Sequence, residues 1–361
     1  MQRTFLIAIP TIFLLLGSYA RAQQAVPSPT APSSVASFED AQIPVAAVRP
    51  TFEDAQNLAS KGRLDKAMEI LDQLAAHPPE AAGVERLRGV IFYQREQFSK
   101  AIEAFAKAVA ADPGDRESTE MQGVSLFRLG RATEALPFLE KSHSAVERAN
   151  VDPEYVLGLC YTDLQRYDDA RRAFAAQYGF EPDSPEAHLL AARLFLRREF
   201  VPVAEAEAHK ALKLNPVLPL AHQLLGEVAL AKGDLNAAIT ELEAERKINP
   251  LNGVMYDRLG DAYLRNERYT DAQQALNRAV LLEPNATGPY ILLGEAFLKL
   301  KQPIQALHYL DHAAKMDPSN YITHNLLGQA YKAVGQLAEA NREFQTGVAL
   351  QHNAPPPAPR K

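Results

Sequence analysis

The chain has 361 residues, a formal net charge of -6, 47% apolar residues and 23% charged residues. This length exceeds what one compact core usually spans, so we expect several domains or a repeat array. The acidic balance gives no general attraction to nucleic acid, and we expect no nucleic-acid partner. The one cysteine, Cys160, can form neither an intramolecular disulfide nor a thiolate metal cluster, which excludes a disulfide-stapled scaffold.

The first 22 residues, MQRTFLIAIPTIFLLLGSYARA, have the parts of a secretory signal peptide. Arg3 gives a basic start, an apolar run follows, and Ala20-Arg21-Ala22 supplies a small-x-small cleavage site. We therefore expect an exported protein, periplasmic or secreted, cleaved after Ala22. The alternative is a retained anchor, although the apolar run is shorter than the ~20 residues that span a bilayer. Membrane contact is expected only if this segment is uncleaved.

Two further segments are predicted to lie outside the folded part. Residues 23–47 are rich in proline, serine and alanine, which is typical of a flexible linker. Residues 353–361 contain four prolines, which is typical of a disordered tail that cannot continue a helix. The fold is therefore expected within residues 48–352.

The region between these segments is an internal repeat. A column, meaning the set of equivalent positions in successive units, holds small residues at steps of 34 or 35: Ala55, Gly89, Gly123, Gly158, Ala192, Gly226, Gly260, Gly294 and Gly328. Twelve positions after each of them stands an alanine: Ala67, Ala101, Ala135, Ala170, Ala204, Ala238, Ala272, Ala306 and Ala340. A turn sequence such as Lys232-Gly233-Asp234 separates the two columns, so each unit is predicted to be helix, turn, helix. Such hairpins must stack to bury their apolar faces.

The units resemble the tetratricopeptide repeat family. One unit carries Gly260, Tyr263, Tyr269, Ala272, Ala279 and Pro284 in the family pattern, and the next carries Gly294, Phe297, Ala306, Ala313 and Pro318. The resemblance implies an all-α fold: a right-handed superhelical α-solenoid of about nine helix hairpins. The units would start near residues 48, 82, 116, 151, 185, 219, 253, 287 and 321.

Two departures from the pattern stand out. The third unit is one residue longer and carries Pro137 in its second helix, which predicts a kink or late start and an irregular joint over residues 137–152. After the ninth unit the sequence passes directly to Pro355, so Phe344, Val348 and Leu350 are predicted to form an exposed C-terminal edge. That edge could serve docking or self-association, or the tail could fold over it.

Candidate chemical groups favour packing over catalysis. His188, His222 and His324 share one slot with Tyr256 and Tyr290, which predicts a ring packed between helices. The pair His308 and His312 is spaced for a metal site, but no third ligand stands near it in the sequence. Cys160 stands where other units have alanine, which predicts an inert buried thiol. We predict no catalytic, metal-binding or cofactor-binding residue.

By the resemblance, the first helices line a concave groove that holds an extended peptide or a helix. The groove residues would be Tyr155, Leu159, Asp163, Arg193, Arg197, Gln223, Glu227, Asp257, Asp261, Arg265, Ile291, Glu295, Lys299, Asn325 and Gln329. Asp261 with Arg265, and Glu295 with Lys299, are also spaced as simple surface ion pairs.

The groove does not match the carboxylate clamp of the chaperone-binding family members. That clamp needs a lysine and an asparagine four residues apart, and the corresponding positions hold Arg86 with Val90, or Asp257 with Asp261. A groove with these two acids would repel a carboxylate.

The leading hypothesis is a non-enzymatic scaffold or adaptor outside the cytoplasm that binds a protein or peptide in the groove. Narrower or competing hypotheses are an accessory subunit of a cell-envelope assembly, secretion or export machine, a membrane-anchored scaffold, and a hydrolase with its site in the groove. For the hydrolase, the sequence offers only helix-spaced surface pairs in place of converging titratable groups.

Overall fold

The computed structural model describes residues 50–76, 83–143 and 153–353, and in these ranges the regular structure is entirely helical. The predicted all-α fold is therefore confirmed. The predicted signal peptide, the linker and the tail beyond residue 353 lie outside the described residues. None of the described helices is both long and apolar enough to cross a membrane.

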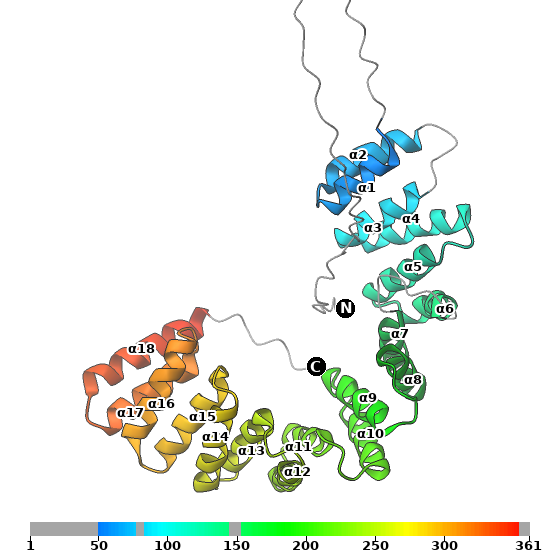
Figure 1. The fold of residues 1–361 in the computed structure, drawn as a ribbon. Coiled ribbons are helices and arrows are strands. Elements are labelled where there is room, and N and C mark those ends of the chain that lie inside the picture. Colours follow the sequence, from blue (N-terminus) through cyan, green and yellow to red (C-terminus); the bar gives the residue numbers. More distant parts are fainter. Residues whose placement is uncertain (1–49, 77–82, 144–152, 354–361) are drawn as a thin grey trace, which may run out of the picture. The chain divides into compact units, whose positions relative to one another are not determined.

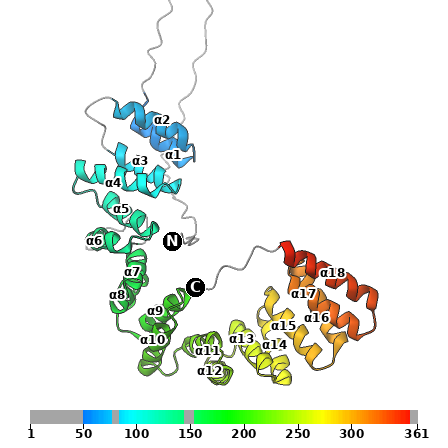
Figure 2. The ribbon, with the colours of Figure 1, turned by 180° about the vertical axis from the view of Figure 1, so that it is seen from behind.

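The chain divides into two compact units, residues 1–166 and 167–361. Figures 1 and 2 show the helices of both, coloured along the sequence. The helices of unit 1 are α1 Phe52–Ser60, α2 Leu64–Ala75, α3 Val84–Gln94, α4 Phe98–Ala111, α5 Arg116–Arg128, α6 Ala132–His143 and α7 Pro153–Asp163. Those of unit 2 are α8 Tyr167–Tyr178, α9 Pro185–Arg197, α10 Val201–Leu214, α11 Ala221–Lys232, α12 Leu235–Ile248, α13 Gly253–Arg265, α14 Tyr269–Leu282, α15 Thr287–Lys299, α16 Pro303–Met316, α17 Tyr321–Ala333 and α18 Leu337–Asn353. Within each unit, first helices of successive pairs contact one another.

The turn inside each pair has one geometry throughout. Its middle residue has a positive φ and is glycine in four pairs, Gly62, Gly130, Gly233 and Gly335. In the other five pairs it is Glu96, Gln165, Glu199, Glu267 or Lys301, with φ of 58–65°. The next N–H donates to a carbonyl five residues earlier, as from Asp234 to Ala229 at 2.9 Å, which is the pattern of a Schellman cap. The turn thereby satisfies carbonyls at the end of the first helix.

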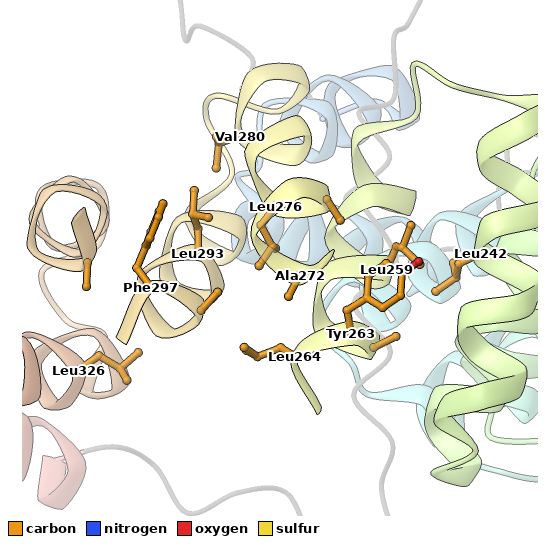
Figure 3. Close-up of a cluster of buried hydrophobic side chains, with 14 of the residues drawn as sticks. Leu242, Leu259, Tyr263, Leu264, Ala272, Leu276, Val280, Leu293, Phe297 and Leu326 are labelled. Carbon is orange, nitrogen blue, oxygen red and sulfur yellow. The ribbon is translucent and has the colours of Figure 1, made fainter. Parts of the chain in front are cut away.

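The small-residue column marks where the two helices of a pair cross. A methyl group added to Gly260 would lie 2.4 Å from Leu276 Cγ, and one added to Gly226 would lie 2.6 Å from Leu242 Cγ. The nine alanines of the second column are 0–2% exposed. Figure 3 shows Leu242, Leu276 and their neighbours forming a continuous apolar core across α12 to α17. The close helix approach inferred from the small residues is present.

The prediction for the irregular third unit is wrong in one part. Pro137 lies inside α6, which begins five residues earlier, at Ala132. The predicted late start is therefore wrong, because the helix is already established when the proline is reached. The part of the predicted joint beyond residue 143 lies outside the described residues. At the other end, α18 extends to Asn353, the first residue of the predicted tail.

Candidate protein-binding face

Five first helices of unit 2, α9, α11, α13, α15 and α17, contact one another in succession. Most of the predicted groove residues stand at equivalent positions on these helices. We call the following residues the first-helix face: Arg193, Arg197, Gln223, Glu227, Asp257, Asp261, Arg265, Ile291, Glu295 and Lys299. Arg197, Arg265 and Lys299 are exposed, Gln223 is buried, and the others are half-buried. The predicted groove residues Tyr155 and Asp163 lie on α7, in unit 1.

The predicted surface ion pairs form unequally. Arg265 Nη1 lies 3.5 Å from Asp261 Oδ2, with both side chains substantially exposed, so the pair contributes little to stability. No ion pair joins Glu295 to Lys299 within the described residues, although their spacing is the same. Sequence spacing permits such a pair but does not fix the rotamers of two long, solvated side chains. The expectation for Glu295 and Lys299 is therefore wrong.

Asp257 is an acid of the first-helix face whose buried carboxyl group is incompletely hydrogen-bonded. Its Oδ1 atom is buried and has no hydrogen-bond partner, while Oδ2 lies 3.4 Å from Arg258 Nη1. Burial raises the pKa of the Asp257 carboxyl, Arg258 lowers it, and the carboxylate of Asp261 raises it further. An additional cation beside Asp257 would stabilise its ionised form.

Glu227, by contrast, is held in place by a side-chain network. Gln223 Nε2 donates to Glu227 Oε1 at 2.8 Å, and Gln223 Oε1 accepts from Asn252 Nδ2 at 2.5 Å. Asn252 Oδ1 also accepts from the N–H of Met255 at 3.1 Å and so caps α13. The network joins α11 to the start of α13. Gln223 and Glu227 were predicted from the sequence as groove residues, whereas Asn252 was not predicted.

The position shared by His188, His222 and His324 makes a polar contact in addition to packing between helices. The Nδ1 atoms of His188, His222 and His324 lie 2.6–2.7 Å from a carboxylate oxygen of Glu207, Glu241 and Glu343, respectively. The glutamate follows its histidine by 19 residues each time. Where the slot holds Tyr256 or Tyr290, the position 19 residues later is Ala275 or Tyr309. This paired substitution could have been found in the sequence, and it indicates a structural cross-helix contact.

The other candidate groups lie apart from the face. Cys160 is fully buried on α7. His308 and His312 are exposed on the second helix α16. Across the described ranges, no three His, Cys, Asp or Glu side chains are placed to hold a metal ion together.

The C-terminal edge is less buried than the equivalent positions in the earlier pairs. Phe344 is half-buried, whereas the residues at its position in the other eight pairs are all 0% exposed: Leu71, Phe105, Leu139, Phe174, Ala208, Leu242, Leu276 and Leu310. Val348 is 53% exposed, and Leu350 is half-buried. Phe344, Gln345, Val348 and Ala349 line a surface depression of about 330 Å³. Apolar atoms are therefore accessible along α18.

Comparison with models of known protein families shows to which family the chain belongs. The tetratricopeptide repeat model matches residues 52–116, 189–252 and 258–320, which together exceed half of the chain. The chain belongs to the tetratricopeptide repeat family, whose members serve as protein-interaction scaffolds and whose fold is generally non-enzymatic. A second model, described as anaphase-promoting complex, cyclosome, subunit 3, matches residues 94–177.

The individual proteins described next are each less than 30% identical to this chain. The peroxisomal targeting signal receptor of Kluyveromyces lactis is 28% identical over 145 residues, which are 39% of this chain and 25% of the receptor. The crystal structure of YrrB, described as a TPR protein with an unusual peptide-binding site, is 21% identical, with 51% of this chain and 94% of YrrB covered and a TM-score of 0.46. A crystal structure of MamA is 21% identical, with 45% and 95% covered and a TM-score of 0.42. The chain thus spans about a quarter of the receptor's length.

Proposed function

We propose that this protein is a non-enzymatic scaffold outside the cytoplasm whose first-helix face binds a segment of another polypeptide. Family membership supports the protein-binding role. The arrangement of residues 1–22 as a basic start, an apolar run and a cleavage site supports export. An accessory role in a cell-envelope machine is a narrower form of the same proposal.

We choose the first-helix face because the carboxyl group of Asp257 is incompletely hydrogen-bonded there. Its buried Oδ1 lacks a partner, and Asp261 adds a second negative charge nearby. The Asp257 side chain is still 17% exposed, and a lysine or arginine side chain from a partner placed beside this accessible part would offset both negative charges. A partner carboxylate would add to the repulsion between them. We therefore propose a partner segment that presents a basic residue to Asp257.

The test is fluorescence anisotropy of the full chain with two short labelled peptides, one alternating lysine with serine and the other alternating glutamate with serine. We expect the lysine peptide to bind more tightly, and Asp257→Asn to weaken it about tenfold, since a hydrogen bond to a charged group is lost. Asp271→Asn, at a half-buried acid on α14 outside the face, is the matched control. Equal binding of both peptides, or equal effects of both variants, would reject the proposal.

Export is tested separately by fractionation and N-terminal sequencing of the protein from its own cells. A first residue of Gln23 in the periplasm or medium is expected. Recovery in the membrane with Met1 retained would favour the anchored scaffold, and recovery in the cytoplasm would contradict export.

A second binding activity, self-association through the C-terminal edge, is favoured by the exposure of Val348 and the partial exposure of Phe344. The equivalent of Phe344 in each earlier pair is fully buried. The segment Phe344 to Asn353 contains no Asp, Glu, Lys or Arg, so two copies could meet there without opposed like charges.

A further inference from the structure

Glu245 is a buried acid at a position that holds alanine in four of the other pairs. It lies on α12 and is 0% exposed. The equivalent residues of four other pairs are alanines, Ala108, Ala211, Ala279 and Ala313. A buried carboxylate loses its hydration and needs donors in return. The helix hairpin itself does not require this residue, because the alanine-bearing pairs form the same structure.

The donors come from the first turn of α11. The N–H of Leu220 donates to Glu245 Oε1 at 2.8 Å, and the N–H of Gln223 lies 3.3 Å from Oε2. The carboxylate thereby sits at a helix N-terminus, where unpaired N–H groups and the helix dipole favour a negative charge. Leu220 itself makes no side-chain cap.

Leu220 also has an unusual backbone. Its φ is 71° and its ψ is -8°, the left-handed conformation, which is unfavourable for a leucine. Such a residue persists only where its surroundings hold it. The hydrogen bond from its own N–H to Glu245 is a direct restraint of that kind.

The turn restrained in this way is the one that presents Gln223 to the first-helix face. Gln223 is 3% exposed, and its amide is used on both sides, donating to Glu227 and accepting from Asn252. A rotation of the first turn of α11 would displace the Gln223 amide from both partners. The carboxylate of Glu227 would then lose its fixed position.

We infer that Glu245 is a positioning residue: it fixes the first turn of α11 and, through Gln223, the orientation of Glu227 for partner recognition. The inference rests on the proposed function of the first-helix face. A merely stabilising role is a weaker explanation, because a buried charge seldom stabilises more than a well-packed apolar residue would.

The experiment compares the full chain with Glu245→Ala and Glu245→Gln. The matched control is Glu243→Ala, which removes a glutamate of the same helix that contacts Tyr263 on α13 and not the first turn of α11. Hydrogen–deuterium exchange is measured in a peptide that contains Leu220 and Gln223. We expect about tenfold faster exchange in Glu245→Ala, a smaller change in Glu245→Gln, which keeps one acceptor oxygen, and none in Glu243→Ala. Exchange equal to that of the control would overturn the inference, and Glu245→Gln decides it if the alanine variant does not fold.

Binding of the lysine peptide supplies the second readout. We expect Glu245→Ala and Gln223→Ala to weaken it by similar factors, about fivefold, and the double variant to lose little more, because both changes release the same carboxylate. Unchanged binding by Glu245→Ala would overturn its role in recognition. If the native chain fails to bind the peptide, the proposed function fails, and the exchange result still decides whether Glu245 fixes the turn.

Discussion

At the scale of single residues, the glycines of this chain have two different reasons for being glycine. Gly260 is required by space, because an added methyl would lie 2.4 Å from Leu276 Cγ at the helix crossing. Gly233 is required by conformation: it has a φ of 79°, and nothing lies within 4 Å of an added methyl. The two requirements predict different penalties for the same substitution.

We expect Gly233→Ala to destabilise the protein by about 1 kcal/mol, the cost of a left-handed alanine. Gly260→Ala should cost more, about 2–3 kcal/mol, because the core must shift to admit the methyl group. Urea unfolding followed by circular dichroism measures both. A larger loss for Gly233→Ala than for Gly260→Ala would contradict the assignment.

Tyr263 provides a prediction about pH. Burial, with the hydrogen bond and the negative charge of Glu243, raises the pKa of the Tyr263 hydroxyl from 10.0 to about 12. The folded state thus favours the neutral phenol. This contribution to stability is fully present below pH 10 and is lost as the pH rises from about 10 towards 12. Tyr263→Phe, which cannot ionise, should therefore lose less stability than the native chain over this interval. An identical pH dependence of the two urea midpoints would contradict this.

At the scale of elements, Asn252 and Asn320 make the same kind of cap but differ in what else they touch. Asn252 accepts from one N–H group at the start of α13, and Asn320 accepts from two at the start of α17. Only the side chain of Asn252 also donates to Gln223. Replacing either by alanine should cost about 1 kcal/mol of stability.

Only Asn252→Ala should also weaken binding of the lysine peptide, because it releases Gln223. Unfolding and anisotropy measurements on both variants separate the two effects. Equal binding by Asn252→Ala and Asn320→Ala would show that the network does not reach the face.

The helices were predictable because their signal is periodic. Small residues such as Gly260 and alanines such as Ala272 recur with the repeat, and each reflects one packing requirement. The contacts that shape the face were less predictable. Asn252, at the start of α13, reaches Gln223 on α11 of the preceding pair, and Glu245 reaches backbone N–H groups of another helix. Neither contact follows from spacing along one helix. Glu245 did leave a signal, because it is the one acid at a position that holds alanine in four of the other pairs.

At the scale of the whole molecule, the C-terminal edge predicts self-association. Val348→Glu places a charge on an exposed apolar position of α18 and should shift the protein to a smaller species in analytical ultracentrifugation. Ile304→Glu, at a 73% exposed position on α16, is the control and should leave the distribution unchanged. A monomeric native chain, or equal behaviour of both variants, would remove the edge as an interface.

The central claim is that the first-helix face of unit 2 binds another polypeptide. Site-specific photo-crosslinking in cells tests it most directly, with a crosslinking amino acid at Ile291, on the face, or at Ile304, on the second helix α16. The account predicts a discrete protein adduct from position 291, weak or no adduct from position 304, and loss of the adduct when Asp257→Asn is added. Adducts of equal strength from both positions, or an adduct at 291 that survives Asp257→Asn, would contradict it.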